Sequence, residues 1–240
     1  YFDIFPWEDI SQDSEGFDMG CGSGRWAQFV ISKVGRLNCI DPSSAIYVAE
    51  SNLKKYDNAF FYKETVDACS LENESQDFGY SLGVLHHIPD TQKAINDCAI
   101  KLKKGAPFLL YLYYDFEDKP ALFKLIWKLT DLLRIKVISK LPPRIKKTTC
   151  SIIAITIYYP LAKFSRMLEI LGINVENMPL SDYRNKSFYI MSNDALDRFG
   201  TKLEQRFSKK DITNMLKNSG FHKITFSNRT PYWTCISYKA

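Results

Sequence analysis

Three glycines stand at alternate positions near the start of this 240-residue chain. They are Gly20, Gly22 and Gly24, and Asp18 precedes them at the same spacing. Glycine has no Cβ, so such a loop can turn sharply and let a ligand approach its backbone closely. A helix that begins after the loop offers free N–H groups to a carboxylate or a phosphate. The loop therefore predicts a binding site for a ligand that carries such a group.

The glycine loop alone does not decide the ligand. Its register Gly22-x-Gly24-x-x-Ala27 also fits the fingerprint of dinucleotide-binding proteins. A nicotinamide-dependent oxidoreductase is therefore one interpretation of the motif.

Two later acids narrow the choice. Asp41 closes a predicted strand over 36–40, where a nucleoside-binding sheet places a carboxylate on ribose hydroxyls. Asp67 follows a predicted strand over 59–63, where a carboxylate could accept the adenine amino proton. Asp18, Asp41 and Asp67 together suit a cationic sulfonium with an amino group, whereas an anionic dinucleotide favours neutral or basic loops.

Residues 15–114 alternate between predicted strands and helices. The strands are expected over 16–19, 36–40, 59–63, 77–82 and 107–114, and the helices over 25–34, 44–55 and 91–102. This alternation indicates a parallel sheet covered by helices on both faces. A helix over 208–218 and strands over 221–227 and 232–239 then predict an antiparallel hairpin at one edge.

The segment 115–206 breaks this alternation and contains helix-like stretches at about 119–141 and 161–171. We therefore predict an α/β fold, a doubly wound sheet with a helical cap inserted after the fifth strand. The core is expected to comprise residues 1–114 and 207–240, and the cap residues 115–206.

Taken in order, these motifs resemble those of class I S-adenosylmethionine-dependent methyltransferases. The resemblance rests on the glycine loop, on Asp41, on Asp67-Ala68 and on the segment from Asp77 to Asp90. It covers about residues 15–114 and, more loosely, 207–240. It implies S-adenosylmethionine as cofactor and a mostly parallel seven-stranded sheet whose last strand is antiparallel. A non-catalytic module that keeps only the cofactor site is the remaining alternative.

The resemblance also implies which residues hold the cofactor. The glycine loop would hold the methionine part, Asp41 the ribose, and Asp67 with Ala68 the adenine. The segment from Gly83 to His87 would border the methyl-transfer site. The cofactor-binding residues expected are Asp18, Gly20, Cys21, Gly22, Gly24, Asp41, Pro42, Asp67, Ala68, Gly83 and Val84.

The catalytic candidates are His86, His87, Tyr113 and Asp115. Histidine titrates near neutral pH, so either histidine could act as a general base, although both could simply pack and shape the pocket. Tyr113 and Asp115 end the fifth strand and could line the acceptor site. The acceptor is expected to be a small-molecule or lipid-linked O, N or C nucleophile. No metal site is expected, because no carboxylate stands at ligand spacing from the histidines.

Basic residues are concentrated in one segment. From Lys119 to Lys147 there are nine basic residues and one acid, Asp131, so this segment carries +8 while the rest of the chain sums to −3. Two sets of side chains recur there at helical spacing on opposite faces: Lys124, Lys128, Asp131 and Arg134 on one, and Leu122, Ile126, Leu129 and Leu133 on the other. The simplest interpretation is an apolar face on the core and a solvated basic face.

The basic segment has a second interpretation, contact with an anionic membrane surface or an anionic acceptor through residues 119–147. Nucleic-acid binding is not expected, because no binding module is recognisable and no aromatic residues are interleaved with the basic run. The oligomeric state cannot be read from the sequence.

The remaining features bear on compartment. The six cysteines form no CxxC pair, so free, buried thiols in a reducing, cytoplasmic compartment are expected. The first residues show no signal peptide, and the absence of an initiator Met suggests that residues precede Tyr1. The most apolar run, Ile152 to Tyr159, is far shorter than the roughly 20 residues of a membrane span.

Overall fold

The computed structural model describes residues 1–117, 121–175 and 178–240, with the side chain of Leu122 also left out of the description. The chain divides into two compact units. The core unit comprises Tyr1–Glu117 and Gln205–Ala240, and the helical unit comprises Asp118–Glu204. Each unit has its own hydrophobic core and is considered by itself.

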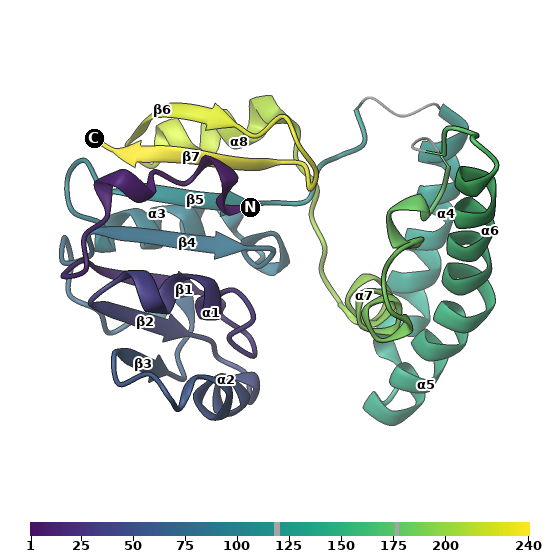
Figure 1. Ribbon diagram of the computed structural model, residues 1–240, viewed down its shortest axis with the longest axis horizontal. Helices are drawn as coiled ribbons and strands as arrows, with labels where there is room; N and C mark the ends of the chain where they lie inside the picture. Colours follow the sequence, from purple (N-terminus) through teal and green to yellow (C-terminus); the bar gives the residue numbers. More distant parts are fainter. Residues whose placement is uncertain (118–120, 176–177) are drawn as a thin grey trace. The chain divides into compact units, whose positions relative to one another are not determined.

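The core unit contains a seven-stranded sheet in the order β3-β2-β1-β4-β5-β7-β6 (Figure 1). The five strands from β3 to β5 run parallel, and β7 is antiparallel to both of its neighbours. The predicted doubly wound sheet with an antiparallel last strand is confirmed. The strands are β1 (Glu15–Met19), β2 (Arg36–Ile40), β3 (Ala59–Tyr62), β4 (Phe78–Leu82), β5 (Pro107–Tyr111), β6 (Phe221–Phe226) and β7 (Thr234–Lys239).

Hydrophobic clusters cover both faces of this sheet, because alternate side chains of a strand point to opposite faces. Phe17 and Met19 of β1 pack with α3 (Thr91–Lys101) and α8 (Lys209–Asn218). Leu37 and Cys39 of β2 pack on the other face with α1 (Ala27–Val30) and α2 (Ala45–Leu53). All six cysteines are buried and free, as expected.

Two predicted elements are shorter than expected. The first helix is limited to α1 and is followed by a 3-10 turn over Ile31–Lys33. The fifth strand ends at Tyr111 rather than at residue 114. Beyond Tyr111, Leu112 exchanges backbone hydrogen bonds with Trp233, and Tyr114 forms an isolated bridge with Phe207. After Tyr111 the chain therefore no longer pairs with β4. It contacts Trp233 and Phe207 instead, which belong to the last segment of the core unit, Gln205–Ala240.

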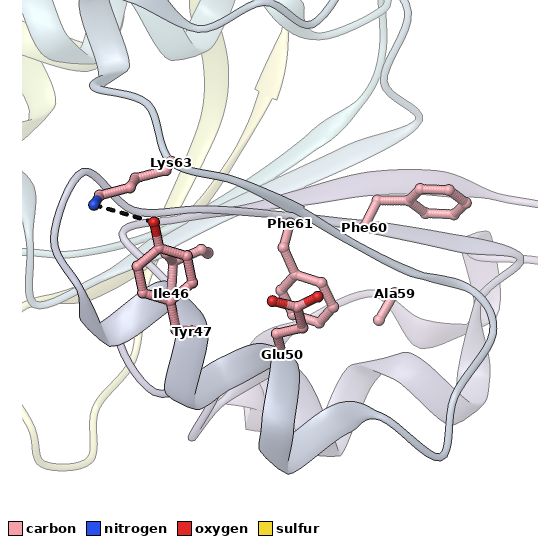
Figure 2. Close-up of a pocket in the computed structure, with 7 residues that line it drawn as sticks. All are labelled: Ile46, Tyr47, Glu50, Ala59, Phe60, Phe61 and Lys63. Carbon is pink, nitrogen blue, oxygen red and sulfur yellow. Dashed lines mark hydrogen bonds between the residues drawn. The ribbon is translucent and has the colours of Figure 1, made fainter.

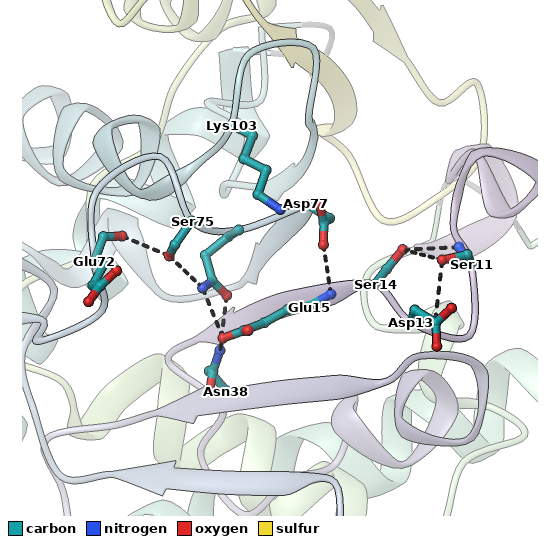
Figure 3. Close-up of polar contacts among 10 residues, drawn as sticks. Ser11, Asp13, Ser14, Glu15, Asn38, Glu72, Ser75, Asp77 and Lys103 are labelled. Carbon is teal, nitrogen blue, oxygen red and sulfur yellow. Dashed lines mark hydrogen bonds and ion pairs between the residues drawn. The ribbon is translucent and has the colours of Figure 1, made fainter.

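A polar network joins the amino-terminal ends of β1, β2 and β4 (Figure 3). The Asn38 amide donates to Glu15 Oε1 (2.8 Å) and to Gln76 Oε1 (3.0 Å). Asp77 accepts the Glu15 backbone N–H (2.9 Å) and pairs with Lys103 (2.7 Å). These buried and half-buried groups form hydrogen bonds with one another and hold the amino-terminal ends of the three strands together.

The helical unit contains four α-helices in the described residues (Figure 1). Its small apolar core brings Ala154, Tyr158 and Ala162 against Met191 and Ala195. The sequence predicted only the first and third of its helices, because the intervening run is rich in β-branched residues and follows two prolines. The helices are α4 (Ala121–Lys136), α5 (Pro143–Ile153), α6 (Tyr159–Ile170) and α7 (Phe188–Gly200), with a π-helical turn over Ala154–Tyr158.

The predicted orientation of α4 is wrong. Arg134, expected on the solvated basic face, is 1% exposed, whereas Ile126, Leu129 and Leu133 are 54%, 59% and 50% exposed. Lys119 lies outside the described residues. The reason is a charged network: Arg134 pairs with Asp131 (2.8 Å) and donates to the Thr201 carbonyl oxygen (3.0 Å).

A second ion pair extends this network. Arg198 lies 3.8 Å from Asp131 and 2.6 Å from Glu204, whose side chain is fully buried. A buried charge is retained only when it is paired and hydrogen-bonded, and these four side chains meet that condition together. Asp131 and Arg134 of α4 are therefore directed into the helical unit.

Replacing Arg134 tests this arrangement. Arg134→Met removes the guanidinium and leaves Asp131 without its closest partner, so we expect the free energy of unfolding to fall by about 3–5 kcal/mol. Lys128→Met, an exposed position on the same helix, should change it by less than about 0.5 kcal/mol. Urea unfolding followed by circular dichroism and by intrinsic tryptophan fluorescence measures both. Equal effects of the two variants would contradict a structural role for Arg134.

Candidate active site

The glycine loop follows β1 at the carboxyl edge of the parallel strands. The Gly20 and Cys21 backbone N–H groups both donate to the Ile40 carbonyl oxygen, at 2.8 and 3.0 Å. Gly20, Gly22 and Gly24 have φ values of 83°, 55° and 75°, a region that glycine adopts without steric cost. The sequence spacing of the glycines thus corresponds to three left-handed backbone positions.

Asp41 ties the loop to the end of β2. Its Oδ2 accepts the Gly22 N–H (2.9 Å), and its Oδ1 accepts the backbone N–H (2.8 Å) and the hydroxyl (2.5 Å) of Ser43. A carboxylate has about four acceptor positions, so further hydrogen bonds from a ligand are available to Asp41. The neighbouring Pro42 is exposed.

Gly20 and Gly22 need to be glycine for different reasons. A Cβ on Gly20 would lie 2.4 Å from Val84 Cγ1, so Gly20 lets the loop close against the segment that follows β4. A Cβ on Gly22 would meet no atom within 4 Å. Gly22 therefore presents bare backbone to open space beside Asp41, which is the geometry that a nucleoside-type cofactor with a charged amino-acid portion requires.

Asp18 differs from the sequence interpretation. It is 2% exposed, on the sheet face that also buries Tyr80. Burial raises its pKa to about 8, with a smaller contribution from the Asp41 charge, while the nearby Tyr80 hydroxyl acts in the opposite direction. At pH 7 the Asp18 carboxyl is mostly protonated and does not supply the negative charge assigned to it from sequence.

Asp67 and Ala68 lie in the exposed turn over Val66–Ala68 that follows β3. A hydrogen bond from the Thr65 side chain lowers the pKa of Asp67, so this carboxylate is charged at neutral pH. It lies at the carboxyl edge of the sheet, two strands from the glycine loop. The structure does not give it a contact with the loop.

A pocket of about 300 Å³ lies between α2 and β3 (Figure 2). Tyr47 and Lys63, which are linked by a 3.3 Å hydrogen bond, line it together with Glu50, Phe60 and Phe61. None of the residues expected to hold the cofactor lines this pocket. We assign it to the outer edge of the sheet and not to the active site.

The catalytic candidates gather at the ends of β4 and β5. The His86 ring stacks on the Tyr113 ring with centroids 3.8 Å apart, and the His87 ring lies 4.2 Å from that of His86. Gly83 lies beside Tyr111, and a Cβ added at Gly83 would lie 3.6 Å from the Tyr111 ring. Three of the four predicted side chains are thus brought together.

The two histidines have different environments. His86 is fully buried, and burial is the largest of the effects that lower its pKa to about 2, so the ring is neutral. Neither of its ring nitrogens has a hydrogen-bond partner within the described part of the chain. His87 is partly exposed. Asp115, the fourth candidate, is exposed and accepts the Glu117 backbone N–H (3.0 Å), so it shapes the local turn.

Sequence reasoning missed Arg206. Its guanidinium lies 5.0 Å from the centre of the Tyr113 ring and 4.4 Å from that of Phe116, and it donates to the Tyr114 carbonyl oxygen (3.1 Å). The next residue along, Gln205, donates its backbone N–H to the His86 carbonyl oxygen (3.0 Å). Both residues re-enter the core unit after the helical unit, so no local spacing signals their place in the site.

Known proteins show the same architecture. Residues 17–110 match the family described as methyltransferase domain. An S-adenosylmethionine-dependent methyltransferase of Methanosarcina mazei is 17% identical with a TM-score of 0.59, over 99% of this chain and 98% of that one. A methyltransferase of Bacillus halodurans is 13% identical with a TM-score of 0.56, over 94% and 71%. No curated protein matches the sequence.

A third solved structure is that of phosphoethanolamine N-methyltransferase 2 of Haemonchus contortus, in complex with phosphomonomethylethanolamine and S-adenosylhomocysteine. It is 16% identical with a TM-score of 0.53, over 96% of this chain and 37% of that one. At these identities the three likenesses concern the fold.

The strand order, the glycine loop and the family match are those of class I, Rossmann-like S-adenosylmethionine-dependent methyltransferases. The family match covers residues 17–110, and together with the fold it supports S-adenosylmethionine as cofactor. The nicotinamide alternative is not supported, because a dinucleotide-binding sheet has the order 3-2-1-4-5-6 without an antiparallel strand inserted beside β5. In the described residues no group of three metal-binding side chains occurs.

The open space at Gly22 gives a matched test of the cofactor site. Gly22→Val should abolish S-adenosylhomocysteine binding, because the branched side chain enters the space left for the ligand. Gly105→Val is the control: Gly105 also has a positive φ (82°) and no atom near its Cβ, but lies in the turn between α3 and β5. Both variants carry a similar backbone strain of about 1–2 kcal/mol.

Isothermal titration with S-adenosylhomocysteine measures the difference. We expect normal affinity for Gly105→Val and no measurable binding for Gly22→Val, with both proteins folded by circular dichroism. Wild-type affinity in Gly22→Val would place the cofactor elsewhere.

The raised pKa of Asp18 predicts how stability depends on pH. Between the ordinary value of 3.8 and the folded-state value of about 8, the folded chain keeps a proton that the unfolded chain has released. Stability is therefore lost as the pH rises through this window. Asp18→Asn removes the titration, so from pH 5 to pH 8 the urea midpoint of wild type should fall relative to that of the variant. Asp57→Asn, at an exposed turn, should follow wild type; a parallel course of all three would refute the assignment.

Proposed function

We propose that this methyltransferase acts on a small-molecule or lipid-linked acceptor with an O, N or C nucleophile, held beside His87 and Tyr113. The observation that carries the proposal is the aromatic cluster at the ends of β4 and β5, next to Gly83. His87 and Tyr113 are both partly exposed there. Backbone at Gly22 and the carboxylate of Asp41 would hold the cofactor on the neighbouring strands.

His86 serves as a positioning residue in this proposal. Its pKa of about 2 makes it a poor base at neutral pH, and its burial keeps it from the acceptor. Its stack on Tyr113 fixes the orientation of the phenol ring. His87 is the residue that we assign as general base.

The bound cofactor supplies an electrophilic methyl group on a sulfonium. The acceptor therefore needs a nucleophile in line with that group, and His87 removes the proton that an O or N acceptor releases. Arg206, over the face of Tyr113, gives the site a positive charge that suits an acceptor with an anionic group. The phosphomonomethylethanolamine in the Haemonchus protein is an acceptor-sized molecule of that kind, which supports the proposal.

Labelled methyl transfer tests the acceptor class. Protein and S-adenosylmethionine with a tritiated methyl group are incubated separately with a lipid extract, a small-molecule extract, protein and RNA. We expect label in the lipid or small-molecule fraction. Label confined to protein or RNA would overturn the assignment of the acceptor.

With the labelled fraction as substrate, His87→Gln should reduce turnover at pH 7 by about 10²-fold or more, as the loss of a general base does, with unchanged affinity for S-adenosylhomocysteine. His222→Gln, at an exposed position of β6, is the matched control and should have wild-type turnover. Wild-type turnover in His87→Gln would remove His87 from the chemistry while leaving the acceptor class intact.

A further inference from the structure

The helical unit exposes far more apolar side chain than the core unit. Among the described residues, nineteen of the exposed large apolar side chains belong to the helical unit and five to the larger core unit. Isolated apolar residues on a surface are normal, but a set gathered on one small unit marks a surface that contacts something apolar.

Helix α4 shows how this surface is built. Leu125, Leu129 and Leu132 follow one another along one face and are 55%, 59% and 49% exposed. The opposite face holds Asp131 and Arg134 inside the unit. A helix of a water-soluble protein normally has the reverse arrangement, with its apolar stripe inward. The charged network described above therefore fixes α4 with its leucines directed outward.

The next two helices also expose apolar side chains. Ile152 on α5 is 54% exposed, and Phe164, Met167 and Ile170 on α6 are 46%, 50% and 77% exposed. No helix in the described part of the chain is long and apolar enough to cross a membrane. The apolar residues therefore suit contact with an apolar layer from one side rather than passage through it.

Positive charge is concentrated in the same helices. Residues 121–175 contain ten basic residues and two acids, whereas residues 178–204 contain four of each. The only exposed acid among the described residues of 121–175 is Glu169, which pairs with Arg184 (2.8 Å). The exposed basic residues there are Lys128, Lys136, Lys140, Arg144, Lys147, Lys163 and Arg166.

We propose that α4, α5 and α6 bind the surface of an anionic lipid bilayer. Leucine and isoleucine side chains enter the region between headgroups and acyl chains, and lysine and arginine side chains extend to the anionic headgroups. The positive charge favours this occupant over a second copy of the chain, because two copies would bring like charges together. The inference does not depend on the proposed acceptor, since lipid binding can be measured without cofactor or substrate.

Sedimentation with vesicles tests the proposal on the full chain. At low salt we expect binding to vesicles that contain phosphatidylglycerol and at least tenfold weaker binding to pure phosphatidylcholine. Raising the salt to 0.5 M should weaken the binding to the anionic vesicles, because exposed charges are then screened over a shorter distance.

Three sets of substitutions separate the contributions. Leu125→Gln, Leu129→Gln and Leu132→Gln together keep helix-forming residues on α4 and should reduce binding to anionic vesicles at least tenfold. Lys128→Gln, Lys136→Gln and Lys140→Gln together should abolish the preference for phosphatidylglycerol. Val48→Gln with Ile100→Gln, two similarly exposed apolar positions of the core unit, is the control and should bind like wild type. Circular dichroism and S-adenosylhomocysteine affinity confirm folding.

Several outcomes would overturn the inference. The first is that the wild-type protein does not bind anionic vesicles at low salt. The second is equal binding of the wild-type protein to both kinds of vesicle, and the third is wild-type binding by the leucine variant. Self-association in light scattering that the leucine variant loses would assign the surface to a second copy instead. Binding to double-stranded DNA in preference to anionic vesicles would assign it to nucleic acid.

Discussion

The hydrogen bond from the Gly22 amide to Asp41 is the interaction on which the proposed cofactor site depends. It joins the loop after β1 to the end of β2, across two strands that are adjacent and in register. The left-handed φ of Gly22 aims the amide at the carboxylate and leaves open space where a side chain would stand. The proposed site is thus formed by backbone geometry at the ends of two adjacent parallel strands. At the amino ends, the Glu15, Asn38 and Gln76 network holds the same strands together.

Burial, rather than residue type, separates the roles of similar side chains around this loop. Asp18 and Asp41 are both acids at strand ends, but the fully buried Asp18 keeps its proton to a pKa of about 8. His86 and His87 are adjacent in sequence, yet burial makes His86 neutral, whereas the His87 side chain is partly exposed. In each pair one residue is therefore buried in the core unit and the other is partly exposed.

The elements predicted correctly from sequence are those with local causes. Three features depend on residues that are close together in the chain: the glycine spacing, the alternation of strands and helices, and the final hairpin. From these features the sheet with its antiparallel last strand was predicted correctly. The errors concern partners that are distant in sequence. Arg134 is buried because Arg198 and Glu204, more than sixty residues later, complete its network, and Arg206 reaches Tyr113 only after the helical unit ends. A helical pattern of charged and apolar residues does not say which face such partners will cover.

The misassigned face of α4 shows why the helical unit has an unusual surface. A helix with charged residues on one side and leucines on the other can pack in two ways. In water its leucines face the protein interior, and next to an apolar layer they face outward. The helix propensity of the residues is the same in both arrangements. The ion pairs inside the helical unit therefore determine which face of α4 points outward. Because Asp131 and Arg134 are paired within it, turning α4 to hide its leucines would break a buried charge pair and expose its partners. The unit therefore keeps its leucines outward at a cost in hydration, and contact with an apolar layer removes that cost.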